Sequence, residues 1–311
     1  MHVLIGGGTG LIGRALTRSL TADGHRVTIL SRSPGNAVHL PAGAQALYWD
    51  ARTVGEWASA VDGADVVLNL AGESIGGTGF FDVRWTPARK KRILESRIQS
   101  GHALLEAIKA ASHKPGVLIQ ASAVGYYGTE NGDNEIDESF GPGNDFPARV
   151  CVDWEQATAP VEKLGVRRVV LRIGVALSTR GGALPRQMLP FNLFVGGPIG
   201  SGRQWYPWIH LADIVGAARF MMTHEDARGP VNLVSPDSLT NAEFGQALAR
   251  ALHRPYYLPV PAFALNLLFG EAAVMLLEGH KVVPTRLKEL GYEFQFPEVQ
   301  AALEDLLASR Q

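Results

Sequence analysis

The stretch Val3-Leu4-Ile5-Gly6-Gly7-Gly8-Thr9-Gly10-Leu11-Ile12-Gly13 decides how the chain begins to fold. Its apolar start predicts a strand over residues 3–5, and the apolar spacing after the glycines predicts a helix over residues 11–21. The glycines satisfy both the GxGxxG pattern and its GxxGxxG variant. They lie between a strand and a helix, which is the context that a dinucleotide-binding turn requires.

Glycine at these positions has a chemical purpose. It permits a tight turn, lets the backbone approach a pyrophosphate, and lets the helix pack closely on the strand. The N-terminus of the following helix then attracts phosphate. We therefore expect a dinucleotide to bind at Gly7, Thr9, Gly10, Leu11 and Ile12. A glycine-rich turn without a ligand is the alternative, and the conformational cost of so many glycines argues against it.

Short apolar runs alternate with helical stretches over the first half of the chain. Strands are predicted over residues 26–30, 66–68, 117–120 and 169–173, and helices over residues 86–111 and 149–164. This alternation predicts an α/β fold: a Rossmann-type doubly wound parallel sheet with helices on both faces.

The rhythm changes after about residue 175, where glycine pairs interrupt the chain. We expect residues 1–175 to form a dinucleotide-binding domain, to which the segment at about 205–235 returns. Residues 176–311 would form a smaller C-terminal substrate-side lobe with a helical extension. Helices are predicted within this part over residues 211–223, 241–252 and 298–308.

Composition excludes several classes of protein. Lys and Arg number 29 and Asp and Glu number 30, so the net charge of 29 − 30 = −1 offers no basic excess for nucleic acid. No apolar run is long enough to cross a membrane, and a single cysteine, Cys151, forms no internal disulfide. With no targeting signal visible, we expect a cytoplasmic protein with a small-molecule substrate and no nucleic-acid or membrane partner. The oligomeric state stays open.

The end of the second predicted strand indicates which dinucleotide binds. An NAD site places an acidic residue about twenty residues after the glycine turn, where it holds the ribose 2′-hydroxyl. This chain has Ser31 and Arg32 there. A guanidinium pairs with a 2′-phosphate, so the sequence favours NADP over NAD. The alternative for Arg32 is a solvated loop cation.

Further motifs support a family resemblance. They are Asn69-Leu70-Ala71-Gly72-Glu73, Ala121-Ser122-Ala123, Gly125-Tyr126-Tyr127-Gly128, Trp154-Glu155, Gly196–Gly202, Trp208–Asp213 and Leu277-Glu278-Gly279. With the glycine turn, they make the chain resemble the extended short-chain dehydrogenase/reductase superfamily and, within it, the epimerase family of NADP-dependent oxidoreductases. The resemblance covers nearly the whole chain and implies cofactor contacts at Leu70, Ala71, Glu73, Arg97 and Val175.

The usual catalytic pair of that superfamily is missing. Its members use a Tyr-x-x-x-Lys pair and a serine that polarises the substrate carbonyl, and Ser122 matches that serine. Cys151 stands in the tyrosine position and Glu155 in the lysine position. A carboxylate cannot supply the lysine's charge, and it would raise the pKa of the thiol. The catalytic candidates are therefore Ser122, Tyr126, Tyr127 and Cys151, and for the last three simple packing is an open alternative.

Two classes of function follow from these residues. The first is an NADP-dependent oxidoreductase or epimerase acting on an unknown small substrate. The second is a protein that binds or senses NADPH without turnover. Two further groups are weighed: His210 and Asp213 are interpreted as structural, and the loop 196–203 with Trp205 and Trp208 as either a substrate-side wall or a packed interface.

Overall fold

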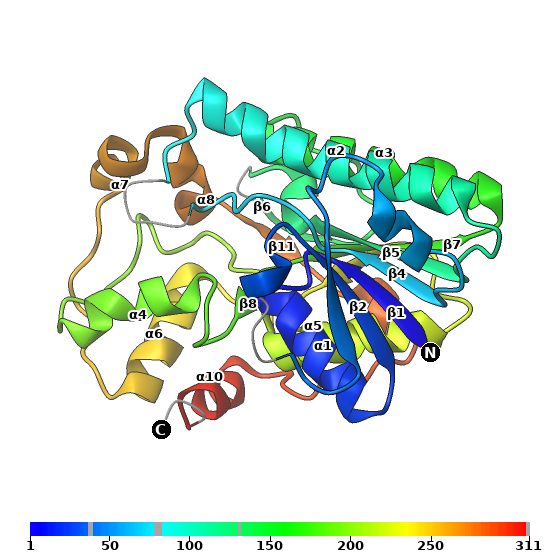
Figure 1. The fold of residues 1–311 in the computed structure, drawn as a ribbon. Coiled ribbons are helices and arrows are strands. Elements are labelled where there is room, and N and C mark those ends of the chain that lie inside the picture. Colours follow the sequence, from blue (N-terminus) through cyan, green and yellow to red (C-terminus); the bar gives the residue numbers. More distant parts are fainter. Residues whose placement is uncertain (37–39, 78–82, 130–131, 309–311) are drawn as a thin grey trace.

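The fold centres on a seven-stranded parallel sheet (Figure 1). The computed structural model describes the whole chain except residues 37–39, 78–82, 130–131 and 309–311. The strand order is β10-β7-β5-β4-β1-β2-β3. The strands are β1 (His2–Gly6), β2 (Arg26–Ser31), β3 (Ala44–Tyr48), β4 (Val66–Asn69), β5 (Val117–Ala123), β7 (Arg167–Ile173) and β10 (Gly229–Leu233).

Helices cover both faces of this sheet. Helices α1 (Leu11–Ala22) and α5 (Leu211–Thr223) lie on one face, and α2 (Pro87–Ala110) and α3 (Phe146–Thr158) on the other (Figure 1). Successive strand side chains point to opposite faces, so Ile5 joins the core under α1 and α5 while Leu4 joins the core under α2. This confirms the predicted fold class.

The second half of the chain adds small elements around the carboxyl ends of the strands. Two short parallel pairs form, β8 (Val175–Leu177) with β9 (Trp208–His210) and β6 (Gly132–Ile136) with β11 (His280–Val282). The helices here are α4 (Leu184–Asn192), α6 (Asn241–Leu252), α7 (Ala262–Phe269), α8 (Val274–Leu277), α9 (Thr285–Glu289) and α10 (Val299–Ala308). Helices α4, α6 and α10 share a third apolar core.

The predicted elements agree best with the structure where the apolar period is regular, since the helix predicted over residues 11–21 is α1 (Leu11–Ala22), which has no side-chain cap. Helices α5 and α6 have the predicted bounds, and Thr240 forms a capping box with Glu243. The prediction for residues 149–164 is wrong at its start: α3 begins at Phe146 because Asp145 caps it, and residues 159–164 tighten into a 3-10 helix. Strands β3 and β10 were not predicted.

Within the described residues, no helix is long and apolar enough to cross a membrane. The same part of the chain holds no group of three His, Cys, Asp or Glu side chains placed to bind a metal ion.

Candidate functional site

The glycine turn joins β1 to α1 and has no room for side chains at its glycines. A Cβ on Gly13 would lie 2.6 Å from the carbonyl oxygen of Gly7, and a Cβ on Gly8 would lie 2.5 Å from Ile29 Cγ2. Gly7 has a φ of +80°. Helix α1 begins without a side-chain cap at Gly10. The turn therefore exposes backbone N–H groups at a helix N-terminus, as a diphosphate requires.

The end of β2 presents one cation beside this turn. Ser31 is buried, and its Oγ accepts a hydrogen bond from the N–H of Ser33 at 3.2 Å. Arg32 follows it and is exposed, and among the described residues it forms no ion pair. Asp50 is occupied by a local turn, in which it accepts hydrogen bonds from the N–H groups of Arg52 and Thr53. The guanidinium of Arg32 is thus available to an anion.

The residues that follow β4 lie directly against the glycine turn. A Cβ on Gly7 would lie 2.9 Å from the amide nitrogen of Ala71 and from the carbonyl oxygen of Leu70. The fully buried Asn69 holds this bend, because its Oδ1 accepts the N–H of Ala71 and its Nδ2 donates to Gln120 Oε1. The fold therefore brings Leu70 and Ala71 to the phosphate turn, at the point where the strand order reverses.

Arg97 is a buried cation without a carboxylate hydrogen bond. Its Nη1 donates to the carbonyl oxygens of Glu73 and Ile93, both at 2.9 Å, and its guanidinium lies 4.7 Å from the ring of Trp154. Its Nε is buried with no hydrogen-bond partner, and burial lowers the pKa of the guanidinium to about 10. A buried charge in this state is unfavourable unless an anion or polar group completes its environment.

Some polar groups of Glu73 and Val175 are already engaged within the fold. The carboxylate of Glu73 lies 3.4 Å from Arg92 Nε and is turned toward α2, so its backbone carbonyl is the part that meets Arg97. The N–H of Val175 is already donated to the carbonyl oxygen of Pro207 at 2.7 Å. Any cofactor contact of Val175 must therefore use its carbonyl or its side chain.

Ser122, Glu155 and Arg172 form one buried polar network. Ser122 Oγ donates to Glu155 Oε1 at 2.7 Å. Arg172 donates to the same carboxylate through Nε, at 3.0 Å from Oε1, and through Nη2, at 3.1 Å from Oε2. All three residues are buried. The charge of Glu155, which stands in the lysine position, is thus balanced by Arg172 of β7. The hydroxyl of Ser122 already donates its one hydrogen bond to Glu155.

The two tyrosines differ in their surroundings. Tyr127 is buried; its hydroxyl donates to Asn232 Oδ1 and accepts from Arg172 Nη1. Burial raises the pKa of Tyr127 to about 12, which favours the packing interpretation for this residue. Tyr126 is half-buried, and its ring lies 3.4 Å from the guanidinium carbon of Arg172. Tyr126 is therefore the phenol that remains accessible beside the network.

Cys151 is a buried thiol in α3. Its pKa is raised to about 11, first by burial and then by the charge of Glu155. The direction is the one that the sequence predicted, but burial is the larger cause. A thiol with this pKa stays protonated at neutral pH, so the environment favours the packing interpretation.

The loop 196–203 packs closely on the C-terminal part of the chain. A Cβ on Gly197 would lie 2.0 Å from the carbonyl oxygen of Leu258. Trp208 is buried in the third apolar core, whereas Trp205 is half-buried and donates from Nε1 to Asp133. These contacts favour the packed interface over a substrate-side wall for most of this loop.

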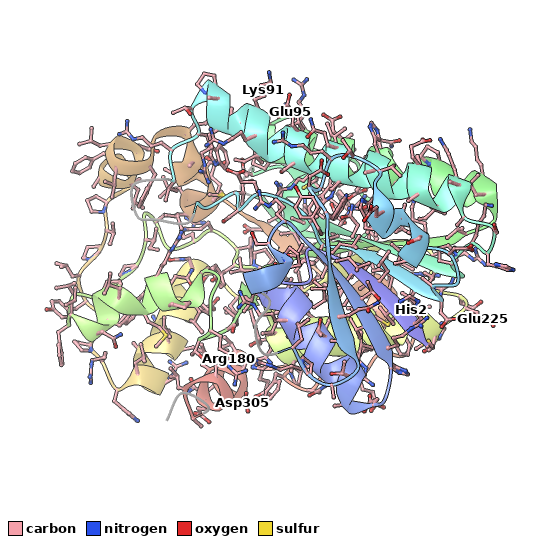
Figure 2. The ribbon with its side chains drawn as sticks, in the orientation of Figure 1. His2, Lys91, Glu95, Arg180, Glu225 and Asp305 are labelled. Atoms are coloured by element: carbon pink, nitrogen blue, oxygen red, sulfur yellow. The ribbon has the colours of Figure 1, made fainter. Side chains whose placement is uncertain are left out.

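His210 and Asp213 are structural, as the sequence indicated. His210 Nδ1 accepts the N–H of Ala212 and caps α5. Its Nε2 lies 3.4 Å from Oδ2 of Asp305, a residue of α10 that is labelled in Figure 2. Asp213 lies in the first turn of α5, where its charge favours the positive end of the helix dipole, as predicted. It also accepts the N–H groups of Gln295 and Phe296 and so anchors the C-terminal segment.

We expect acid to weaken the fold through His210. Burial lowers its pKa, so the unfolded chain takes up a proton at a higher pH than the folded chain, and stability is lost as the pH falls below about 6.5. Protonation of Nδ1 also removes the cap. Urea unfolding at about pH 7.5 and about pH 5.5 measures this loss. His210→Asn, which retains a cap acceptor, should show a smaller difference; an equal difference in both proteins would assign the effect elsewhere.

The partner of Glu155 is Arg172, which the sequence alone does not identify. Arg172 lies at the carboxyl end of a strand that was predicted, and an acidic residue in a lysine position requires a nearby cation. That requirement was the signal available in the sequence. This requirement does not show which cation pairs with Glu155, because other arginines, among them Arg167 and Arg168, lie close to Arg172 in the sequence.

Most of the chain matches one known protein family. Residues 3–234 match the NAD dependent epimerase/dehydratase family. Residues 260–306 match a domain of unknown function, DUF1731.

Full-length relatives have similar sequences. The chain is 42% identical over 310 residues to the epimerase family protein SDR39U1 of mouse, covering 99% of this chain and 100% of the relative. It is 40% identical to a chloroplastic SDR39U1 homologue of Arabidopsis thaliana, covering 99% of this chain and 87% of the relative.

Solved structures are similar over the same length. The crystal structure of human SDR39U1 with NADPH superposes with a TM-score of 0.87 at 38% identity, covering 99% of both chains. A UDP-glucuronic acid 4-epimerase of Bacillus cereus in complex with NAD superposes with a TM-score of 0.76 at 16% identity, covering 99% of both chains. At that identity, the likeness is one of fold alone.

Proposed function

Because the chain belongs to the NAD dependent epimerase/dehydratase family, we propose that it binds NADPH at the carboxyl ends of β1, β2 and β4. We further propose that it is an oxidoreductase or epimerase of the extended short-chain dehydrogenase/reductase type. Its substrate would be a small molecule that reaches Ser122 and Tyr126.

One observation carries the cofactor proposal. The turn at Gly7–Gly13 is a backbone cradle in which a Cβ would collide with other backbone atoms at two positions, 2.9 Å away at Gly7 and 2.6 Å away at Gly13. Such a cradle suits a diphosphate that takes its hydrogen bonds from N–H groups. Arg97, buried with an unpartnered Nε, suits an anionic or polar group of the same ligand.

The choice of NADPH over NADH rests on Arg32. It stands where an NAD site has a carboxylate, it is exposed, and no described residue forms an ion pair with it. A guanidinium offers charge-assisted hydrogen bonds to a 2′-phosphate, whereas it gains little from a 2′-hydroxyl. The 38% identical human relative was crystallised with NADPH, which supports the same choice.

When bound, the nicotinamide supplies hydride chemistry. The chain's own residues bind and orient the reactants. The hydroxyl of Ser122 donates a hydrogen bond to Glu155, so the Ser122 Oγ can accept a hydrogen bond from a substrate group. The ring of half-buried Tyr126 lies against the guanidinium of Arg172, and Tyr126 is the residue that we propose for proton transfer.

A second candidate function is supported by the same network. The hydroxyl of Ser122 donates its hydrogen bond to Glu155, and Tyr127 and Cys151 are buried with raised pKa values. A protein that binds or senses NADPH without turnover needs none of these groups in a reactive state. A screen of metabolite fractions separates the two candidates if it follows both NADPH oxidation and the conversion of a substrate into its epimer, which returns the hydride and leaves the nicotinamide unchanged. Either kind of turnover supports the enzyme, and the absence of both from every fraction supports the binding protein.

Fluorescence titration with NADPH and NADH tests the cofactor. We expect tighter binding of NADPH. Arg32→Ala should weaken NADPH binding roughly ten- to a hundredfold, which corresponds to one or two lost charge-assisted hydrogen bonds, and should leave NADH binding unchanged. Arg18→Ala, an exposed arginine on α1, is the matched control. Equal affinity of the unchanged protein for both dinucleotides would refute the proposal.

A further inference from the structure

Large apolar side chains are exposed together on the C-terminal half of the molecule. They lie in two segments, residues 189–195 at the end of α4 and residues 257–268 around α7. We call these residues the apolar face. Its most exposed members are Leu189, Leu193, Phe194, Tyr257, Phe263 and Leu267. A soluble surface rarely gathers so many without a partner.

The two segments form one side of the molecule. The N–H groups of Tyr257 and Leu258 both donate to the carbonyl oxygen of Gly196, and Tyr257 Oη donates to the carbonyl oxygen of Phe194. Figure 1 shows α4, the connection to α7 and α7 itself along the left edge of the molecule. The apolar face is therefore assembled by folding from residues far apart in the sequence.

Local structure holds these side chains outward. Helix α7 is apolar along nearly its whole length, yet Leu265 is its only buried residue. Such a helix normally lies in an apolar environment. Phe194 has a φ of +61°, a conformation that costs energy for a bulky side chain and that is found mainly at functional positions.

A cationic depression lies beside the apolar face. It has a volume of about 700 Å³, and Arg250, His253, Arg254 and Tyr256 are among its lining residues. Arg254 lies 4.6 Å from the ring of Phe194, which joins the depression to the face. Among the described residues, Arg254 Nε and Tyr256 Oη are buried without hydrogen-bond partners, while Arg254 Nη1 donates to the carbonyl oxygen of His253 and Arg250 Nε to Gln300 Oε1. These donors suit an anion with several acceptor oxygens.

The cations are not needed to cap α6. The N–H of Arg254 already donates to the carbonyl oxygen of Ala249, and the N–H of His253 to that of Arg250. Nor do acidic side chains of the same segments balance them. Residues 163–212 and 244–270 contain no Asp or Glu.

We propose that the apolar face docks on an anionic phospholipid surface, with a lipid phosphate in the depression formed by Arg250, His253, Arg254 and Tyr256. The apolar side chains would enter the interface while the arginines meet the headgroups. A second copy of the chain suits this surface less well, because a twofold interface would bring together two copies of a surface whose segments 163–212 and 244–270 carry cations but no Asp or Glu to complement them.

This proposal revises the expectation of no membrane partner. That expectation rested on the absence of a long apolar run in the sequence, a criterion that concerns spanning segments. That criterion does not detect a surface that folding assembles from α4, α7 and the chain segment that leads into α7. The proposal does not depend on the cofactor or on catalysis.

Co-sedimentation with vesicles tests the proposal. We expect the protein to bind vesicles of phosphatidylglycerol and phosphatidylcholine, to bind phosphatidylcholine vesicles weakly, and to dissociate in high salt. Phe194→Asn, in which asparagine tolerates the positive φ, and the double change Phe263→Gln/Leu267→Gln should each lower the partition coefficient roughly tenfold, through lost apolar burial. Arg250→Gln/Arg254→Gln should remove the preference for the anionic vesicles.

Matched controls lie away from the apolar face. Phe140→Gln changes another exposed phenylalanine. Arg228→Gln changes an exposed arginine near Glu225, which Figure 2 places at the opposite end of the molecule. Both controls should bind vesicles as the unchanged protein does, and all variants should retain NADPH binding if folded. Three results would each overturn the proposal: no vesicle binding, stabilisation by inorganic phosphate without vesicle binding, or dimerisation through this face in analytical ultracentrifugation.

Discussion

A Gly13→Ala variant is expected to bind NADPH at least about a hundredfold more weakly, the effect of losing two or more charge-assisted hydrogen bonds. The added methyl would lie 2.6 Å from both the carbonyl oxygen of Gly7 and the Cα of Gly8. Neither backbone atom can move without displacing the turn that carries the N–H groups toward the diphosphate. The start of α1 would have to shift away from β1, and the cradle would open.

The matched control is Gly141→Ala. Gly141 has open space where its Cβ would be and no positive φ, so this change should leave NADPH affinity unaltered. Circular dichroism shows whether the Gly13→Ala protein is folded. A folded Gly13→Ala protein with unchanged affinity would mean that the turn does not hold the cofactor.

Replacing Arg172 with methionine is expected to lower the free energy of unfolding by about 3–5 kcal/mol. The change leaves the carboxylate of Glu155 buried with only Ser122 as a hydrogen-bond donor among the groups described here. It also removes the donor to Tyr127 Oη and the cation from the ring of Tyr126. Urea unfolding monitored by circular dichroism measures the loss.

Two comparisons isolate the cause. Lys109→Met breaks the ion pair with Glu106 on the exposed side of α2 and should lower the free energy of unfolding by less than about 0.5 kcal/mol. The double change Arg172→Met/Glu155→Leu removes both charges and should be more stable than Arg172→Met alone. If Arg172→Met proves no more harmful than Lys109→Met, the buried network does not stabilise the fold.

The part of the site that the sequence predicted well is local. The glycine turn, the strand before it and the helix after it are adjacent in the chain, so their chemistry can be recognised from residue types at fixed spacing. Ser31 and Arg32 follow from the same logic, since the end of β2 is fixed relative to the turn by the parallel register of β1 and β2. The helices predicted over residues 11–21, 211–223 and 241–252 lie within one residue of α1, α5 and α6, because a regular apolar period is also a local property.

The part that could not be predicted depends on contacts between distant residues. Glu155 and Arg172 meet because α3 packs on β5, which pairs with β7, and no spacing rule in the sequence pairs them. The burial that raises the pKa of Cys151 and Tyr127 is likewise a property of the assembled core. The apolar face has the same origin, because neither of its two segments is distinctive alone.

A crystal structure of the protein grown with NADPH examines the central claim most directly. We expect density for the diphosphate against the turn at Gly7–Ile12, with hydrogen bonds from the N–H groups of Leu11 and Ile12, because those of Gly7 and Gly10 are donated to Leu30 and Gly7. The 2′-phosphate should lie within hydrogen-bonding distance of the Arg32 guanidinium. Density for the dinucleotide at another place, or a turn that stays free of it at saturating NADPH, would contradict the account.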